Sequence, residues 1–433
     1  MARFPSFAVF GFGGDLMLAT RRILFIVPYM PNVIRTRPYN LIRALAGEGH
    51  AITVLTLVQD DAEVADAEAL RAEGIRVITR PLSRAHSLMN SAMAPARREP
   101  LQAAYCWQSS LAADLSALLR DETFDVVHVE HLRGSRYGIL ARSTLAAAGR
   151  TTPVVWDSVD CISHLFRQAS AYGTRWLNRM IARVELPGTE RFEGRILKHF
   201  DMVLTTSPVD RMELIRLARQ QNSAAPSVNV LPNGVDLDTF KPDLAVERDP
   251  ATLVLSGKMS YHANVAMAVH LAQEIMPIVW AERPDTRLQI VGKAPTADVR
   301  SLAKDPRIIV TGEVPQIQPY LSRATIAVAP IVYSAGIQNK ILEAMACATP
   351  VVTTSSAMQG LAAEPGRHLL VGEDKHQVAE AIIGLINDPV RREEMGQAGR
   401  YFVEENHNWC SIAGQLSRHY EDLMTYRSEF VAV

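Results

Sequence analysis

Three short segments in the second half of the sequence combine an apolar run, a glycine and a polar or charged residue. They are SGKM with Gly257 and Lys258, VGKAP with Gly292 and Lys293, and TGEVP with Val314. Glycine after a strand lets the backbone approach a ligand, lysine supplies a positive charge for phosphate, and Val314 offers backbone polar groups to a flat ring. One such loop usually makes only a turn, but three together favour a site for a phosphate-bearing ligand.

A fourth segment, SAGIQNKILEAMACATPVV at 334–352, predicts a turn, a helix and then a buried strand. The helix is expected to begin near Gln338. The free backbone N–H groups and the positive dipole end at a helix start suit an anion such as a diphosphate. The residues expected around this helix start are Gly336, Ile337, Gln338, Asn339 and Lys340.

Glu343 is the only carboxylate in this segment and is expected more than one turn inside the helix. A carboxylate there can accept hydrogen bonds from both hydroxyls of a ribose, as acidic residues do in dinucleotide folds. The alternative is an i,i+3 surface pair with Lys340, which stabilises a helix by roughly 0.2–0.5 kcal/mol. The helix taken by itself favours the surface pair.

In the first half, the segment PYMPNVIRTRPYN follows an apolar run and places Arg35 and Arg37 just before a helix that begins at Pro38. Two arginines beside a helix start can clamp a phosphate. They can equally be two solvated loop residues, and the sequence leaves both interpretations open.

Acidic and imidazole side chains follow two further apolar runs. Asp157 ends a run at 152–160, where a carboxylate in a cleft can stabilise an oxocarbenium-like centre or orient an acceptor hydroxyl. For Asp160 we favour capping of the next helix. His131 is the histidine best placed near such a cleft, although a structural role is favoured over a catalytic one. The His, Cys and Asp residues lack the spacing of metal ligands, so the sequence predicts no metal site.

Alternating strands and helices must position these residues. β-rich runs separated by helical stretches predict an α/β protein with doubly wound parallel sheets, in which ligands bind beyond the carboxyl ends of the strands. The first set of runs lies at 22–29, 51–57, 74–80, 124–131, 152–160 and 200–208. The second set lies at 228–236, 252–259, 287–295, 307–315, 324–332 and 349–356.

The length of 433 residues is too great for one ordinary core and predicts two Rossmann-like domains that face a central cleft. We expect a disordered extension at 1–20, a first domain at 21–225 and a second domain at 226–407. We expect a final helix at 408–433 to cross back to the first domain.

The composition is that of a soluble globular protein, with 48% hydrophobic and 21% charged residues. Lys and Arg number 27 against 22 Asp and Glu in residues 1–225, and 18 against 24 afterwards. The first half therefore has a mild positive field, which suits a phosphate-bearing ligand or a membrane surface and is too weak to indicate nucleic acid. Four scattered cysteines and the lack of an apolar run long enough to span a bilayer predict a cytoplasmic protein with free thiols.

The segment 173–200 predicts a helix with arginines on one face and apolar residues on another. Such a helix can lie on an anionic membrane, where a lipid-linked substrate would be found. A helix packed against the core with a solvated basic face is the commoner outcome. The residues concerned are Arg175, Trp176, Leu177, Arg179, Met180, Ile181 and Arg183.

The segments GIQNKILEAMACATPVV, LPNGVDLDTF and SGKMSYHANV resemble glycosyltransferase family 4, in this order over about residues 21–410. The nearest likeness is to bacterial exopolysaccharide-cluster sugar transferases. The resemblance implies a GT-B fold, a nucleotide-sugar donor bound to the second domain, an acceptor on the first, retention of configuration and no metal cofactor. It also implies that Glu343 is the ribose ligand and that Lys258 contacts the donor phosphate, and we expect these two residues and Asp157 to carry the catalysis.

The chain departs from the family pattern at three positions. Ala335 stands where the family has a second glutamate that contacts the donor sugar, and Gln338 or Asn339 could take over that contact. Asp157 stands at a strand end where the family often has a histidine.

Asn264 stands where the family has a second basic residue for the donor phosphates. The candidates for the missing charge are Lys293, Lys340, Arg35 and Arg37.

These observations predict transfer of a sugar from a nucleotide diphosphate-sugar to a saccharide or lipid-linked acceptor, in exopolysaccharide or cell-surface glycan synthesis. The expected location is the cytoplasm, with peripheral contact to the inner membrane surface and no nucleic-acid partner. Two alternatives remain open. One is an inactive scaffold of the same fold, and the other is an epimerase or hydrolase that acts on a nucleotide-sugar without an acceptor.

Overall fold

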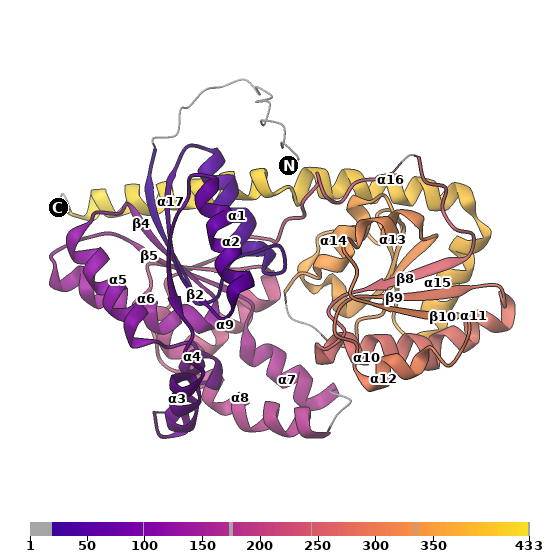
Figure 1. Cartoon of the computed structure of the whole chain (residues 1–433), viewed down its shortest axis with the longest axis horizontal. Helices are drawn as coiled ribbons and strands as arrows, with labels where there is room; N and C mark the ends of the chain where they lie inside the picture. The colour runs from indigo at the N-terminus through magenta and orange to yellow at the C-terminus, as the bar shows by residue number, and fades with distance from the viewer. Residues whose placement is uncertain (1–19, 98, 173–175, 244, 334–335, 432–433) are drawn as a thin grey trace.

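The protein has two lobes that lie side by side in the computed structural model (Figure 1). The structure describes residues 20–97, 99–172, 176–243, 245–333 and 336–431. The expected extension at 1–20, apart from its last residue, and the positions of Arg175 and Ala335 lie outside these ranges.

The first lobe is built on a seven-stranded parallel sheet with the order β3-β2-β1-β4-β5-β6-β7. Its strands are β1 (Arg22–Val27), β2 (Ala51–Val58), β3 (Arg76–Pro81), β4 (Val126–Glu130), β5 (Val154–Val159), β6 (Met202–Thr205) and β7 (Ser227–Val230). Its helices are α1 (Thr36–Gly47), α2 (Asp61–Ala72), α3 (Arg84–Arg97), α4 (Leu101–Tyr105), α5 (Ser109–Asp121), α6 (His131–Ala147), α7 (Ile162–Tyr172), α8 (Trp176–Ile196) and α9 (Pro208–Gln220).

The second lobe is built on a six-stranded parallel sheet with the order β10-β9-β8-β11-β12-β13. Its strands are β8 (Thr252–Ser256), β9 (Arg287–Val291), β10 (Ile308–Gly312), β11 (Ile326–Ala329), β12 (Val351–Thr354) and β13 (Leu370–Gly372). Its helices are α10 (His262–His270), α11 (Met276–Glu282), α12 (Ala297–Leu302), α13 (Gln318–Arg323), α14 (Asn339–Ala346), α15 (Lys375–Asn387) and α16 (Pro389–Asn406). The last helix, α17 (Trp409–Val431), returns to the first lobe.

Apolar runs form the central strands because helices cover both faces of each sheet. Residues 23–27 of β1 and 126–130 of β4 are fully buried, as expected of strands in the middle of a doubly wound sheet. Several helices start at a side-chain cap, including Asp60 for α2, Ser207 for α9 and Asp374 for α15. The expected fold class, with two Rossmann-like domains, is confirmed.

One strand belongs to a different sheet from the one expected. Residues 228–236 were expected to open the second set of strands, but β7 pairs with β6 in the first sheet, with Asn229 beside Leu204. The first domain therefore extends past residue 225 to about 230. The sequence suggested otherwise because the LPNGVD turn follows this strand directly, so strand and turn looked like one unit.

The chain crosses between the lobes twice, and the two crossings touch. Val235 N–H donates to the carbonyl of His407, and His407 Nδ1 lies 2.7 Å from the carbonyl oxygen of Asn233. A Cβ on Gly234 would collide with the ring of Trp409, the first residue of α17. From there α17 packs on α1 and buries Leu416 and Tyr420 in the core of the first domain.

Candidate functional site

The three glycine loops of the second domain meet at the carboxyl ends of adjacent strands. Gly257 N–H donates to Val291 O over 3.0 Å, and Gly292 N–H donates to Gly312 O over 3.1 Å. Gly257 and Gly292 have φ of 147° and 149°, where side chains are rarely tolerated. A Cβ on Gly292 would overlap the carbonyl oxygen of Gly257. The backbones of the loops therefore contact each other directly, and residues with a side chain do not fit at Gly257 and Gly292.

Two lysines stand on these loops. Lys258 is exposed and Lys293 is partly exposed. Asn264, which replaces the second base of the family pattern, is buried and donates to the carbonyl oxygen of Lys258 over 3.1 Å. Asn264 thus fixes the loop shape, and the two lysines are the basic side chains at this strand edge. Val314, on the third loop, is half-buried against the core of the domain.

Helix α14, which carries Glu343 and Lys340, follows β11, the neighbour of β8, and so begins at the same carboxyl edge of the sheet. Burial raises the pKa of Glu343 to about 7, and the charge of Lys340 partly offsets that effect. Burial also lowers the pKa of Lys340 to about 8. Lys340 Nζ donates to Gln338 Oε1 over 2.9 Å instead of pairing with Glu343, so the expected surface ion pair does not form. The Glu343 carboxylate makes no hydrogen bond to any other described residue.

The start of α14 connects the two domains. Asn339 donates to Thr36 Oγ1 over 3.2 Å and accepts from Asn233 Nδ2 over 3.1 Å. Gln338 occupies the position before the first helical residue and lines a cavity between the domains. Ile337 is buried in the core of the second domain, so it can offer a ligand only its backbone.

Gly336 presses against the first domain. Its N–H donates to Asp210 Oδ2 over 3.1 Å, and its φ is 64°. A Cβ on Gly336 would collide with the carboxylate of Asp160. The carboxylate of Asp160 therefore lies next to Gly336, which in the sequence directly follows position 335, where the family acid is missing.

Asp160 is not the cap of the following helix, contrary to our expectation. Glu193 fills that role, because its carboxylate accepts from the N–H groups of Ile162 over 2.8 Å and Ser163 over 3.1 Å. Asp160 instead accepts from Thr206 Oγ1 over 3.2 Å. Burial, followed by the charge of Asp210, raises the pKa of Asp160 to about 7.

A cavity of about 180 Å³ lies at this junction. Asp160 lines it from the first domain, and the second domain supplies the other walls, which are Tyr261, Ala263, Asn264, Ile331, Tyr333 and Gln338. The Tyr333 hydroxyl lies 2.5 Å from His262 Nδ1, which fixes its ring. A cavity lined by a carboxylate, two amides and two phenols is suited to a polyhydroxylated ligand.

The carboxyl ends of the first sheet hold a different arrangement. Arg37 and Asp157 are both buried and form an ion pair, with Arg37 Nε 2.8 Å from Asp157 Oδ2. Arg37 Nη1 also donates to Asn233 Oδ1 over 2.9 Å. Asp157 is paired with Glu130 in the register of β4 and β5, which places both carboxylates side by side. Arg37 and Asp157 are thus committed to each other inside the domain.

His128, Glu130 and Asp157 form the one group in the described chain whose ligand atoms lie close enough, within 4.8 Å, to hold a metal ion. Burial raises the pKa of Glu130 well above its usual range and lowers that of His128 to about 4. The guanidinium of Arg37 already supplies a cation to this group, which disfavours a second one. The group is therefore better suited to anchoring Arg37.

Arg35 and Arg37 do not form a single clamp. Arg35 donates to Glu63 Oε1 over 2.9 Å and to the carbonyl of Met30 over 3.0 Å, whereas Arg37 pairs with Asp157. His131 begins α6 with φ of 62°, and its Nδ1 accepts from the Arg133 N–H. Burial lowers the pKa of His131 to about 3, so the ring is neutral at ordinary pH.

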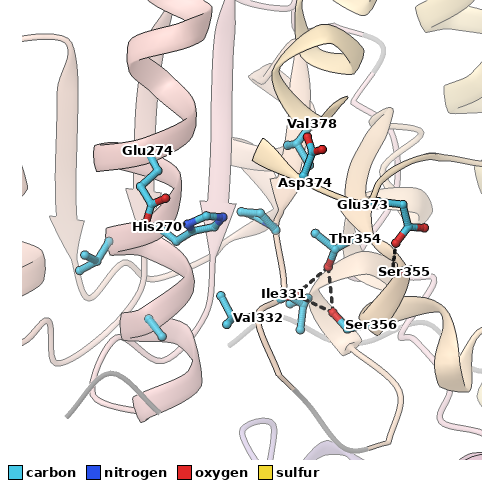
Figure 2. Close-up of a pocket in the computed structure, with 13 residues that line it drawn as sticks. His270, Glu274, Ile331, Val332, Thr354, Ser355, Ser356, Glu373, Asp374 and Val378 are labelled. Atoms are coloured by element: carbon cyan, nitrogen blue, oxygen red, sulfur yellow. Dashed lines mark hydrogen bonds and ion pairs between the residues drawn. The ribbon is translucent and has the colours of Figure 1, made fainter. Parts of the chain in front are cut away.

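A second pocket of about 330 Å³ lies beyond Ile331, which lines both hollows. Figure 2 shows His270 and Glu274 on one wall and Thr354 and Ser356 on the other. Thr354 Oγ1 and Ser356 Oγ both donate to the carbonyl of Ile331, over 2.7 Å and 2.5 Å. These hydroxyls fix the ends of β11 and β12, and the pocket is not part of the candidate site.

The sequence missed Asp160, Tyr261 and Tyr333 as site residues. In the sequence, Asp160 is the second acidic residue of WDSVD and Tyr261 is the aromatic residue of SGKMSYHANV. No sequence signal separates Asp160 from Asp157, because only the left-handed backbone of Val159, with φ of 65°, turns the chain between them.

Two family profiles match this architecture domain by domain. Residues 34–234 match the "Glycosyl transferase 4-like domain" and residues 250–388 match "Glycosyl transferases group 1". The chain belongs to glycosyltransferase family 4. The family assignment made from the motifs is thereby confirmed, and the two lobes are the two halves of a GT-B fold.

Curated relatives in the family share about a quarter to a third of their residues with this chain. A GDP-mannose-dependent monoacylated alpha-(1-6)-phosphatidylinositol monomannoside mannosyltransferase of Corynebacterium glutamicum is 28% identical over 54% of this chain and 65% of its own length. An alpha-maltose-1-phosphate synthase of Mycolicibacterium smegmatis is 32% identical over 43% of this chain and 55% of its own length. The chain thus spans less than two thirds of the length of each of these two relatives.

Among solved structures, HepE of Anabaena in complex with UDP is similar over the whole molecule. It superposes with a TM-score of 0.65 and covers 93% of this chain and 100% of its own. Its sequence identity is 12%, so the likeness shows the fold alone.

Proposed function

We propose that the protein is a glycosyltransferase that moves a sugar from a nucleotide diphosphate-sugar to a saccharide or lipid-linked acceptor. The observation that carries this proposal is the meeting of three glycine loops with two lysines at one strand edge, where the helix that carries the available carboxylate of Glu343 also begins. HepE is solved with UDP-glucose and a curated relative is named for GDP-mannose, which supports a nucleotide-sugar donor.

In this proposal the second domain binds the nucleotide. The Gly292 and Val314 loops contact the base, and Glu343 accepts hydrogen bonds from the two ribose hydroxyls. Lys258 and Lys293 lie on the loops beside Gly257, where the backbone can approach the diphosphate. The start of α14 adds positive potential through the backbone N–H groups of residues 337–339.

The leaving group gains negative charge as the bond from the sugar to the diphosphate breaks. Fixed positive groups stabilise that charge without reorganisation, and one such donor is typically worth about 3 kcal/mol. Lys258 and the helix start are the groups that we assign to this role. They supply the charge without a bound metal, so the proposed reaction needs no metal cofactor.

The interdomain cavity is the proposed sugar subsite. Asp160 lies against Gly336, and we assign to it the sugar-hydroxyl contact that the family makes through the residue at 335. Gln338 lines the same cavity and supplies an amide for a second hydroxyl. Asp157, expected to act at the reacting sugar, acts in this proposal by holding Arg37 and the end of β5 in place.

The acceptor is proposed to bind on the first domain, opposite the donor. Retention of the anomeric configuration, a role in exopolysaccharide or cell-surface glycan synthesis, and a cytoplasmic location are proposals that rest on the family resemblance. Asn339 hydrogen bonds to Thr36 and Asn233 across the domains, which indicates how the cleft is held when the domains approach.

Calorimetric titration of UDP-, GDP- and ADP-sugars tests the proposal. We expect one donor to bind the wild type and to bind Glu343→Gln about 30-fold more weakly. Glu380→Gln is the matched control, because Glu380 is an exposed glutamate on α15 of the same domain. Failure of every donor to bind the wild type contradicts the proposal and favours the scaffold.

Turnover separates the two enzymatic alternatives. Release of free sugar from the bound donor at the same rate with and without acceptor extract would indicate a hydrolase. Interconversion of the nucleotide-sugar without release would indicate an epimerase. Sugar transfer that depends on the acceptor extract and is about tenfold slower in Asp160→Asn is the expected result.

A further inference from the structure

Helix α8 carries apolar side chains on its outer, solvent-facing side. Trp176 and Val184 are 72% and 73% exposed, and Leu177, Met180 and Ile181 are each about half exposed. The opposite side of the helix is buried through Ala182, Thr189 and Glu193. A helix that packs on the core normally exposes polar residues, and no other described part of the chain covers this apolar outer face.

Helix α3 shows the same inversion. Leu88 is 68% exposed, Met89 and Met93 are 54% and 44% exposed, and the buried side of the helix holds Ser87 and Asn90. Leu88 and Met89 are adjacent and Met93 follows Met89 by four residues, so the three side chains lie along one stripe of the helix. The stripe is continued by small exposed alanines at 85, 92 and 96.

The two helices belong to one end of the first domain (Figure 1). The backbone N–H of Leu101, four residues after the end of α3, donates to Glu185 Oε2 over 3.0 Å. Glu185 directly follows Val184 on α8. Leu101 and Tyr105, on the short helix between, are also exposed.

Exposed apolar side chains are concentrated here. Of the nineteen exposed large hydrophobic side chains in the described ranges of the chain, ten lie within 88–105 and 176–184. The other nine are spread over the rest of both domains. Together these exposed side chains form the apolar end of the domain, which consists of Leu88, Met89, Met93, Leu101, Tyr105, Trp176, Leu177, Met180, Ile181 and Val184.

The charged residues within α3 and within the apolar stretch of α8 at 176–184 are all arginines, whereas the acids Glu99 and Glu185 lie just outside these stretches. Arg84 and Arg97 are exposed at the two ends of α3, and Arg183 is exposed on α8. The sequence has no Asp or Glu between residues 84 and 97 or between 176 and 184. Apolar residues flanked by arginines complement a bilayer with anionic headgroups. Methionine, leucine and tryptophan side chains insert into such a bilayer, and arginine side chains reach the phosphates.

We propose that the apolar end docks the protein on a bilayer that contains anionic phospholipid. Docking of this kind is peripheral, and none of the helices in the described ranges is long and apolar enough to cross a bilayer. Ala182, on the inner side of α8, belongs to one buried cluster with Ala169 of α7, Ala266 and Tyr333, and Tyr333 lines the interdomain cavity. If the transferase proposal holds, docking brings that cavity close to a lipid-linked acceptor, but membrane binding itself does not depend on it.

Co-sedimentation of the full chain with vesicles tests the proposal. Vesicles contain equal parts of phosphatidylglycerol and phosphatidylcholine, or phosphatidylcholine alone. We expect binding to the anionic vesicles at least about tenfold tighter than to the neutral ones. The double variants Met180→Glu/Val184→Glu and Leu88→Glu/Met89→Glu should each weaken binding about tenfold or more. Arg183→Gln should weaken it about fivefold on anionic vesicles only.

The matched control is Val390→Glu, an equally exposed valine, at 67%, on α16 of the other domain. It should bind vesicles like the wild type, and all variants should keep the wild-type melting temperature because the substituted side chains are exposed. Failure of the wild type to bind anionic vesicles overturns the proposal. So does equal loss in the control. Light scattering that shows a dimer, dissociated by the α8 variant, assigns the apolar end to a second copy and also overturns it.

Discussion

The carboxyl ends of the two sheets present ionisable side chains in opposite ways. In the first domain Arg37 and Asp157 are buried and paired, with Glu130 in the adjacent register position. In the second domain Lys258 is exposed and the carboxylate of Glu343 is unshared among the described residues. The two edges are equivalent in topology, but one uses its charges for its own fold and the other leaves them available to a ligand.

A charged residue at a strand end is therefore not by itself evidence of a ligand site. A buried pair must be satisfied internally because an unpaired charge in the interior is costly. An unshared carboxylate whose pKa burial has raised to about 7, such as Glu343, carries a cost that a ligand can relieve. Asp160 is the exception in the first domain, because its carboxylate lines the cavity and its side-chain partner among the described residues is the Thr206 hydroxyl.

The largest expected effect tests the internal use of charge in the first domain. Arg37→Met should lower the free energy of unfolding by roughly 3–5 kcal/mol, since it leaves Asp157 buried without its cation. Chemical denaturation of the variant and the wild type measures this loss. The double variant Arg37→Met/Asp157→Leu should regain part of it. A loss below about 1 kcal/mol would contradict a structural ion pair.

The next effect concerns ligand binding in the second domain. Glu343→Gln should weaken donor binding about 30-fold, or about 2 kcal/mol, while leaving the fold intact. The pKa of Glu343 is raised to about 7, so the wild type should bind donor more tightly as the pH rises through 7 and should level off above it. Calorimetry at several pH values should show this dependence in the wild type and not in the variant.

Stability supplies an independent check of the same group. The pKa of Glu343 is about 7 in the folded protein and near its ordinary value of 4.5 when unfolded. The folded state therefore loses stability as the pH rises from about 4.5 to 7. Glu343→Gln should raise the melting temperature at pH 8 and have little effect at pH 4, and the reverse order would contradict the raised pKa.

A smaller effect separates Asp160 from Asp157. Asp160→Asn should lower kcat/KM about tenfold, or about 1.4 kcal/mol, with unchanged affinity for the nucleoside diphosphate alone, because the lost contact is to the sugar. Steady-state kinetics and calorimetry measure the two quantities. Asp210→Asn is a useful comparison, since Asp210 neighbours Asp160 and bonds to Gly336 without lining the cavity. Weaker binding of the bare diphosphate in Asp160→Asn would place Asp160 outside the sugar subsite.

The smallest effect concerns an exposed lysine. Lys258→Met should change the free energy of unfolding by less than about 0.5 kcal/mol because the side chain is exposed, and should weaken donor binding about fivefold. Added salt should weaken donor binding in the wild type and do so less in the variant. Lys304→Met, on an exposed loop lysine of the same domain, is the control and should match the wild type in both measurements.

Much of the second domain could be predicted from local sequence. The apolar runs before Gly257 and Gly292 became strands, and the loops met because parallel strands end at one edge. The departure at β7 shows the limit of this reasoning, since a four-residue strand followed by a turn can join either sheet until its neighbours are known.

The sequence by itself determined the two parallel sheets, the glycine loops and the acid inside the helix at 339–346. These depend on local periodicity and on residues adjacent in the chain. Only the tertiary structure decided which charges are free. Asp157 meets Arg37, 120 residues away, while Asp160 is released from capping because Glu193 takes the N–H groups of Ile162 and Ser163. Burial and pairing set the behaviour of a carboxylate, and both depend on partners that lie far away in the chain.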